Sequence, residues 1–409
     1  MKKNILHLQR NKKKDNLFNF EMKIWNYTVE ELKIKGAYYT ATEIYRQPQI
    51  WQKIYDEVLW QKDNIQVFIN KILQNEKLHI ILTGAGTSAF IGLSLQGTFN
   101  RSLHKFTSSI STTDLVSHPF DYLNPEVPTL IVSFARSGNS PESVAAVKLA
   151  DQICQKCYHL IITCDKDGKL ANYESKNGKF VFLLPPETND QSLAMTSSFT
   201  GMLLAGILIA RLNEIRQLHD KVLLMCNYGE KILNHYAQTI HEIAKLNFQR
   251  AVFLGSGPQF GTATESHLKL QELTDGKIIC KTDSFLGFRH GPKAVIDNTT
   301  LVVYLFSNQP YVVQYENDLV NAMKTGKDTL LEVGIMEAPK PSVALDKTIV
   351  FGEKNLLDED LLSVCSVVPA QMLGFFKSIE LGLHPDTPSE SGAISRVVQG
   401  VTIYPLINY

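Results

Sequence analysis

The sequence predicts an α/β protein in which one parallel-sheet domain occurs twice, after a segment of helices. From Leu78 onward, short apolar runs alternate with helical stretches, which is typical of a parallel sheet covered on both faces. The strand-to-turn motif of Gly84 and Gly86 recurs at Gly255 and Gly257, 171 positions later. The chain has 409 residues, which is long enough for two domains.

Composition narrows the class of function. Lys+Arg and Asp+Glu both number 41, so the formal net charge is +0 and nothing in the overall charge indicates nucleic-acid binding. The basic stretch at residues 1–14 lacks the apolar segment of a secretory signal, and we expect a disordered extension. The apolar run 199–210 is too short to span a membrane, so we expect a core helix. These features predict a cytoplasmic protein with no nucleic-acid and no membrane partner.

Cysteine usage indicates neither a disulfide framework nor a zinc site. Six cysteines in so long a chain are too few for a disulfide scaffold. Cys154 and Cys157 have the spacing of a metal or redox pair, but no second pair completes a zinc site. We expect buried thiols there, with a redox site as the alternative, and we expect no metal.

The expected organisation is a basic tail plus N-terminal helices at 1–77, a first domain at 78–225, and a second domain with a C-terminal tail at 226–409. Thr28-x-x-Glu31 and Thr40-x-x-Glu43 both match a capping box. Pro48 suits the first turn of a helix. The buried face of that helix is predicted from apolar residues at three- and four-residue spacing: Ile50, Trp51, Ile54, Tyr55, Val58 and Leu59.

Two turns in the first domain are predicted to bind a phosphate. In the turn 84–88, glycines let the backbone approach a ligand, and the next helix offers free N–H groups. The turn 133–140 adds several hydroxyls just before Pro141, and hydroxyls with free amides bind a phosphate monoester without a metal. Plain N-capping of two helices is the alternative. The corresponding turn 306–310 has fewer hydroxyls, so the phosphate is predicted in the first domain.

The stretch 265–297 carries the residues suited to proton transfer. We expect a helix bearing Glu265, Lys269 and Glu272, a break at 275–276, a short strand, and a Gly/Pro-rich loop with His290. A carboxylate and a histidine form a candidate acid/base pair. Spacing alone leaves open the alternative that Glu272 is a solvated charge on the helix and His290 an ordinary loop residue.

The motifs resemble those of the sugar isomerase (SIS) family, present twice. TESHLKLQE and GFRHGP resemble the isomerase half of glucosamine-6-phosphate synthase. Longer motifs, GAYYTATEIYRQP, VSFARSGNSPESVAAV, LPPETNDQSLAMTSSFT and SRVVQGVTIYP, resemble the tagatose-6-phosphate ketose/aldose isomerase group, whose members act as galactosamine-6-phosphate deaminase/isomerases. This resemblance extends from about Gly36 to the C-terminus. It implies two tandem SIS-type three-layer α/β domains with parallel sheets.

The resemblance also implies roles for individual residues. Glu272 matches the carboxylate that moves a proton between C1 and C2, and His290 matches the ring-opening histidine that the synthase takes from the neighbouring subunit. Lys269 matches a helix position near the sugar, and we group it with these two as catalytic. The implied substrate- and phosphate-binding set is Gly86, Thr87, Ser88, Arg136, Ser137, Asn139, Ser140, Glu265 and Gln399. No cofactor is implied.

Departures from the synthase favour ammonia release over synthesis. Gln399 stands where the synthase has its imine-forming lysine, and Ala135 and Met195 replace serines. Too few residues precede the first domain for a glutaminase. We therefore expect a deaminating aldose-ketose isomerase that converts galactosamine 6-phosphate to tagatose 6-phosphate and ammonia, in a homodimer that shares its active sites. A plain ketose/aldose isomerase and a non-catalytic sugar-phosphate-binding regulator remain alternatives, as does the gluco configuration at C4.

The roles of one polar loop and one further histidine are left open. The loop 187–191 is either an ordinary polar loop or faces the substrate. For His384 we favour an ordinary loop residue over a sugar ligand.

Overall fold

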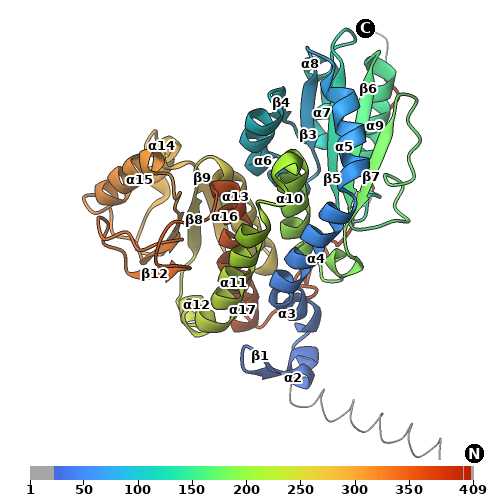
Figure 1. Cartoon of the computed structure of the whole chain (residues 1–409). Helices are drawn as coiled ribbons and strands as arrows, with labels where there is room; N and C mark the ends of the chain where they lie inside the picture. The colour runs from blue at the N-terminus through green and yellow to red at the C-terminus, as the bar shows by residue number, and fades with distance from the viewer. Residues whose placement is uncertain (1–22, 399, 407–409) are drawn as a thin grey trace, which may run out of the picture.

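The computed structural model describes residues 23–398 and 400–406, so the basic tail 1–14 and Gln399 lie outside the described residues. The predicted α/β class is confirmed, because the chain contains two five-stranded sheets in which all neighbouring strands are parallel (Figure 1). The two sheets stand side by side with helices between them and on their outer faces (Figure 1).

The first described residues form a small hairpin, where we expected a helix. Strands β1 (Lys23–Ile24) and β2 (Tyr27–Thr28) pair antiparallel. The prediction was wrong because Trp25 and Asn26 both have positive φ, 49° and 73°, which is the backbone of a tight hairpin turn. Four helices follow: α2 (Val29–Ile34), α3 (Tyr38–Tyr45), α4 (Gln47–Trp60) and α5 (Lys62–Leu73).

The capping box at Thr28 is confirmed, since its side chain accepts from Glu31 N and the Glu31 carboxylate accepts from Thr28 N. The one predicted at Thr40 is wrong, because Thr40 lies inside α3. Asp386 from the C-terminal segment caps this helix instead. Its carboxylate accepts from Thr40 N and Thr40 Oγ1, both at 2.7 Å, and from Tyr39 N at 3.1 Å.

We expect Asp386→Ala to lower the free energy of unfolding by about 1–2 kcal/mol, because it leaves the first N–H groups of α3 without an acceptor. Thermal or denaturant unfolding measures this loss. Asp386→Asn is the matched control, since its amide oxygen still accepts one N–H and most of the stability should remain. Equal stability of Asp386→Ala and the wild type would contradict the capping role.

The predicted apolar face of α4 is confirmed. Ile50, Trp51, Ile54, Tyr55 and Val58 are buried, and Pro48 sits in the first turn. The face packs against α10 (Ser197–Ala210) and α11 (His219–His235). All residues of α10 are buried, so the core helix expected there is confirmed.

The first sheet has the strand order β4-β3-β5-β6-β7. Its strands are β3 (His79–Thr83), β4 (Phe106–Ser109), β5 (Thr129–Ala135), β6 (Cys157–Thr163) and β7 (Lys179–Leu183). Strand β4 was not predicted, since it is a short edge strand with three hydroxyl residues in four. The connecting helices are α6 (Thr87–Leu103), α7 (Thr112–Ser117), α8 (Pro119–Tyr122), α9 (Pro141–Ile153) and the turn η1 (Pro186–Thr188).

The second sheet has the equivalent order, β9-β8-β10-β11-β12. Its strands are β8 (Arg250–Leu254), β9 (Ile279–Asp283), β10 (Thr300–Leu305), β11 (Leu331–Met336) and β12 (Lys347–Val350). Around it lie η2 (Leu212–Glu214), α12 (Ala237–Lys245), α13 (Pro258–Leu273), α14 (Phe285–Phe288), η3 (Pro292–Val295), α15 (Pro310–Met323), α16 (Glu359–Ser366) and α17 (Val368–Glu380).

The two G-x-G turns have the same backbone for the same physical reasons. Gly86 and Gly257 precede α6 and α13 with φ/ψ of 55°/−129° and 56°/−129°. Space is open around both, so the positive φ is what favours glycine there. Gly84 and Gly255 are required because the backbone of the following helix lies close to them. A Cβ at these positions would lie 2.6 Å and 2.3 Å from that backbone.

The two halves share one core. Helices α6, α10, α13 and α16 pack on one another between the sheets (Figure 1). The domain boundary expected at 225/226 lies within α11, which packs on α4 as well as on α16 and α17. We therefore propose that α11 belongs to both halves.

Among the described residues, one helical stretch, Glu359–Glu380, is long and apolar enough to cross a membrane. Within the fold, 94% of its apolar window is buried.

Candidate active site

One large cavity, of about 590 Å³, opens at the carboxyl ends of the first sheet's strands. This is where ligands bind in open parallel sheets, and the volume suits a small phosphorylated sugar. The lining comes mainly from the turn after β3, the loop after β5 with the start of α9, the loop after η1, the second half of α13 with the turn that follows it, and the C-terminal segment 393–398. Of the predicted site residues, it brings together Gly86, Thr87, Ser88, Arg136, Ser137, Ser140, Lys269 and Glu272.

The two hydroxyl-rich turns present helix N-termini to the cavity. Gly86 and Ser140 are the N-cap residues of α6 and α9, and neither helix has a side-chain capping hydrogen bond. Pro141 occupies the first turn of α9, as predicted. Plain N-capping by a side chain therefore does not account for these turns, and the two helix N-termini with the hydroxyls of Ser88 and Ser137 suit an anion.

Arg136 lines the cavity and Asn139 does not, and both side chains bond to other parts of the protein. The Arg136 guanidinium donates to the carbonyl oxygens of Ser192 (3.3 Å), Leu193 (3.1 Å) and Arg396, and the side chain is buried. Asn139 does not line the cavity, and its Oδ1 accepts from Lys169 N at 3.1 Å. In the described structure both side chains hold loops together, so their phosphate contacts stay a prediction.

The helix α13 carries a buried triad of charged groups. Lys269 is completely buried, and its Nζ donates to Glu272 Oε1 and to Thr87 Oγ1 (3.2 Å). Glu265, also completely buried, approaches the same ammonium at 3.1 Å through Oε1. Glu265 is one turn farther from the cavity and does not line it. Glu272 is the member whose carboxylate reaches the cavity.

The electrostatics of this triad favour one ion pair. Burial, together with the charge of Glu272, raises the pKa of Glu265 to about 8, although Lys269 opposes the shift. Burial alone would lower the pKa of Lys269, but Glu265 and Glu272 outweigh it and raise that pKa. At pH 7 the arrangement is thus a protonated Glu265 beside a Lys269–Glu272 ion pair. A carboxylate at the cavity wall, paired with a buried ammonium, is suited to removing a proton from carbon.

Among the described residues, His290 forms no hydrogen bond or ion pair with this triad. It lies between α14 and η3, beyond the edge strand β9 of the second sheet, and its side chain is exposed. It does not line the cavity. The acid/base pair expected from spacing is therefore not formed inside a single chain.

The cavity includes residues that were not predicted as ligands. Leu193 and Met195 line it from the loop after η1, Ser143 from α9, and residues 393–398 from the C-terminal segment. These contacts could not be predicted from the spacing of residues in the sequence, because they form between segments that are far apart in the chain.

The loop 187–191 proves to be structural. Asp190 is buried, and its carboxylate accepts from Thr196 N, Ser197 N and Ser198 N at the start of α10. None of residues 187–191 lines the cavity. His384 is also an ordinary loop residue, with Nδ1 2.8 Å from Lys35 O.

In the second domain, the chain's own carboxylates occupy the equivalent turn. The Ser307 N–H, in the turn 306–310, contacts both oxygens of Glu316 at 3.2 Å and 3.0 Å. Ser307 Oγ donates to Glu359. Burial raises the pKa of Glu316 to about 8. These groups take the donors that a phosphate would need, which supports the prediction of a phosphate in the first domain.

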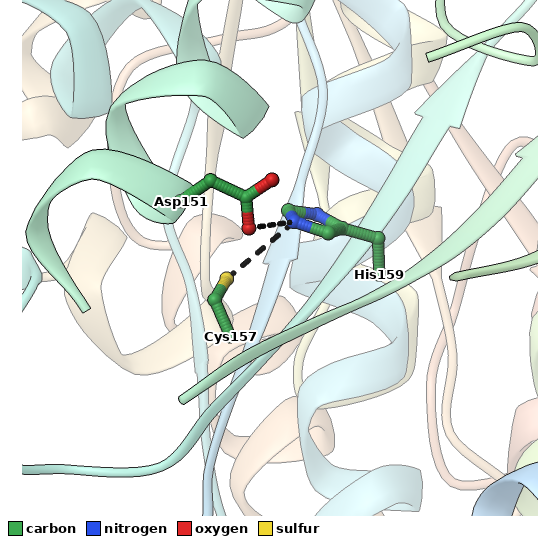
Figure 2. A group of neighbouring side chains, drawn as sticks. All are labelled: Asp151, Cys157 and His159. Carbon is green, nitrogen blue, oxygen red and sulfur yellow. Dashed lines mark hydrogen bonds and ion pairs between the residues drawn. The ribbon is translucent and has the colours of Figure 1, made fainter. Parts of the chain in front are cut away.

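One group among the described residues has metal-ligating atoms close together: Asp151, Cys157 and His159, all within 4.8 Å (Figure 2). His159 Nε2 lies 2.9 Å from Asp151 Oδ1 and 3.6 Å from Cys157 Sγ. The buried Nδ1 of His159 lacks a partner in this part of the structure, whereas a metal-bound histidine normally donates from its second nitrogen. Hydrogen bonding from Nε2–H to Asp151 accounts for the contact without an ion.

The same group lies at the amino ends of the strands, opposite the cavity. Burial raises the pKa of Cys157, so its thiol is protonated and unreactive at pH 7. Cys154 is buried as well. The expectation of buried thiols at these two positions is confirmed.

The SIS domain family matches residues 72–212, which contain the first sheet and both hydroxyl-rich turns. Together with the two parallel sheets, this defines a SIS-domain protein. D-galactosamine-6-phosphate deaminase AgaS of Shewanella sp. (strain ANA-3) is 41% identical over 387 residues, which cover 93% of this chain and 95% of that protein. The chain belongs to the AgaS family of SIS-domain proteins.

Two further comparisons confirm both resemblances. A crystal structure from Clostridium novyi NT, of a protein proposed to be a tagatose-6-phosphate ketose/aldose isomerase, superposes with a TM-score of 0.91 at 39% identity. The superposition covers 94% of this chain and 100% of that one. Glutamine–fructose-6-phosphate aminotransferase (isomerizing) of Pyrobaculum aerophilum is 24% identical over 379 residues, covering 88% of this chain and 58% of that protein.

Proposed function

We propose that the protein is a deaminating aldose-ketose isomerase that converts galactosamine 6-phosphate to tagatose 6-phosphate and ammonia. The observation that carries this proposal is the Glu272 carboxylate, paired with buried Lys269, at the wall of a cavity that is also lined by two helix N-termini without a side-chain cap. A phosphate on those N-termini places the carbon end of a short sugar toward Glu272. The relatives named AgaS support this substrate.

The reaction needs one proton shuttle and one hydrolysis. After the sugar ring opens, Glu272 removes the C2 proton and returns it to C1. In the same conversion O1 gains a proton and the C2 amine loses one, so the C1 aldehyde becomes an alcohol and C2 becomes an imine. Water then adds to the C2 imine, and ammonium leaves as the ketone forms. Lys269 holds the Glu272 carboxylate in place through their ion pair, and the hydroxyls of Ser88, Ser137 and Ser140 hold the phosphate throughout.

The assay that tests the function is ammonia release from galactosamine 6-phosphate and glucosamine 6-phosphate, beside isomerisation of tagatose 6-phosphate. Release from the galacto substrate alone supports the proposal together with its C4 preference. Ketose-aldose exchange without ammonia would instead favour the plain isomerase, for which the Clostridium novyi relative is the specific observation. Binding of the sugar phosphates without either reaction would favour a regulator. Because sugar phosphates are intracellular metabolites, we place the activity in the cytoplasm.

We further propose that the active protein is a homodimer in which His290 enters the partner's cavity. The support is its placement, since the side chain is exposed on a Gly/Pro-rich loop outside its own cavity. There it would move a proton between O1 and O5 to open the ring.

Trans-complementation tests this arrangement. We expect Glu272→Gln and His290→Ala each to be nearly inactive, and a mixture of the two, dissociated and reassembled, to recover about a quarter of wild-type activity. Half of randomly formed dimers are mixed, and each mixed dimer has one intact site. A matched control mixes Glu272→Gln with a Glu272→Gln/His290→Ala double variant, in which no intact site can form. Absence of recovery in the first mixture would contradict sharing between subunits.

A further inference from the structure

Glu43, on helix α3, holds the loop that forms one wall of the cavity. It is completely buried, with 1% exposure. Its Oε1 accepts from Gln191 N at 2.5 Å and Ser192 N at 3.3 Å, and its Oε2 lies 2.5 Å from Ser192 Oγ. Three groups from consecutive loop residues thus converge on one carboxyl group that is 148 positions away in the chain.

Two residues of the same loop line the cavity. Leu193 and Met195 follow directly after the bonded residues and face the space between the serine turns and α13. The Leu193 carbonyl also accepts from Arg136, and its N–H donates to Asp386 O at 3.0 Å. Glu43 thus fixes Gln191 and Ser192, while Arg136 and Asp386 hold the next residue, Leu193.

The hydrogen bonds indicate which form of Glu43 fits. Ser192 Oγ lies near two acceptors, Glu43 Oε2 and Ala194 O at 3.1 Å, but a hydroxyl has only one hydrogen. Both contacts are satisfied when Glu43 carries a proton and donates it to Ser192 Oγ, while Ser192 donates to Ala194. Burial and the charge of Asp190 raise the pKa of Glu43 to about 7, which agrees with this pattern. A glutamine amide would make the same bonds, because it offers one acceptor oxygen and one donor nitrogen.

We propose that Glu43 is a positioning residue for the substrate: by fixing Gln191 and Ser192, it sets the place of Leu193 and Met195 against the sugar. Glu43 does not line the cavity itself and acts through the loop. This inference rests on the proposed function, which identifies the ligand as a sugar phosphate. The ordering of the loop by Glu43 is independent of that function, because the hydrogen bonds form without a ligand.

Hydrogen exchange on the ligand-free protein tests the loop directly. In Glu43→Ala, two buried N–H groups lose their acceptor, so we expect the peptide 187–196 to exchange on the order of tenfold faster than in the wild type. Glu43→Asp withdraws the carboxyl by one methylene and should give the same local effect in a protein that still folds. Glu43→Gln should match the wild type. Glu30→Ala, which removes an exposed carboxylate on α2, is the matched control.

Kinetics separate positioning from a general structural role. We expect Glu43→Ala and Glu43→Asp to raise KM for the sugar phosphate about tenfold with kcat changed less than about twofold, while competitive inhibition by inorganic phosphate stays unchanged. Inorganic phosphate binds the serine turns without reaching Leu193 or Met195, so it reports whether those turns are intact.

Three results would overturn the proposal: unchanged exchange in Glu43→Asp, faster exchange over the whole chain, or equal weakening of inorganic phosphate and sugar phosphate. Loss of function in Glu43→Gln equal to that of Glu43→Ala would also overturn it. If the wild type turns over no sugar phosphate, the proposed function fails, and the exchange of peptide 187–196 still decides the role of Glu43.

Discussion

Replacing Glu272 by Gln is expected to lower kcat by about 10²–10⁴-fold while the sugar phosphate still binds, because the amide cannot accept the C2 proton. The change is nearly isosteric, and the phosphate-binding turns lie on other elements. Turnover assays give kcat, and calorimetry with the substrate or inorganic phosphate gives the binding constant.

Glu265→Gln is the matched control for this substitution. It lies on the same helix and contacts the same lysine, but it does not line the cavity. Its effect on kcat should be small beside that of Glu272→Gln. A Glu272→Gln protein with full activity would remove Glu272 from the mechanism, and an equal loss in both variants would indicate a general effect of the triad.

The second large effect is expected on stability. Lys269→Met should lower the free energy of unfolding by about 3–5 kcal/mol, because removing one partner of a buried ion pair leaves the other charge without compensation. Lys269 is completely buried beside Glu265 and Glu272, and methionine would leave both carboxyl groups without their ammonium partner. Unfolding in denaturant measures the loss, and kcat should fall as well since Glu272 loses the group that holds it in place.

A double variant tests this explanation. Lys269→Met/Glu272→Gln removes the paired carboxylate together with the lysine, so it should recover part of the stability lost in Lys269→Met. A double variant less stable than Lys269→Met would contradict the electrostatic account.

The same triad gives a pH dependence. The folded-state pKa of Glu265 is raised to about 8, above that of an unfolded chain, so the native protein keeps a proton that the unfolded chain releases. Its contribution to stability is therefore full below about pH 4.5 and is lost as the pH rises through 8. Glu265→Gln should lack this decline, and comparing its unfolding with the wild type at pH 5 and pH 8.5 isolates the contribution.

Much of the fold could be predicted from local sequence, because the rules involved act within one turn or one strand. The apolar runs at β3, β5 and β8 can only be buried strands, and the positive φ of Gly86 and Gly257 requires no information from outside the turn. The break after α13 is equally local, since Asp275 and Gly276 both adopt positive φ. The hairpin at Trp25 was missed because neither central residue is glycine.

The site was predictable only in part. Ser88, Ser137, Ser140, Lys269 and Glu272 could be selected from motifs, and all five line the cavity. The hydrogen-bond partners of Arg136 could not be predicted. They are the backbone carbonyl oxygens of Ser192, Leu193 and Arg396, and since every residue has a carbonyl group, no sequence motif marks these three.

By itself, the sequence determined the α/β class, the paired G-x-G turns and the helix that carries Lys269 and Glu272, since each depends on neighbouring residues. Only the tertiary structure decided that Asp386 caps α3, that Glu43 anchors the loop before α10, and that Glu272 lines the cavity while His290 does not. Those outcomes depend on groups that are distant in the chain and meet because burying a polar atom requires a partner, whichever segment supplies it.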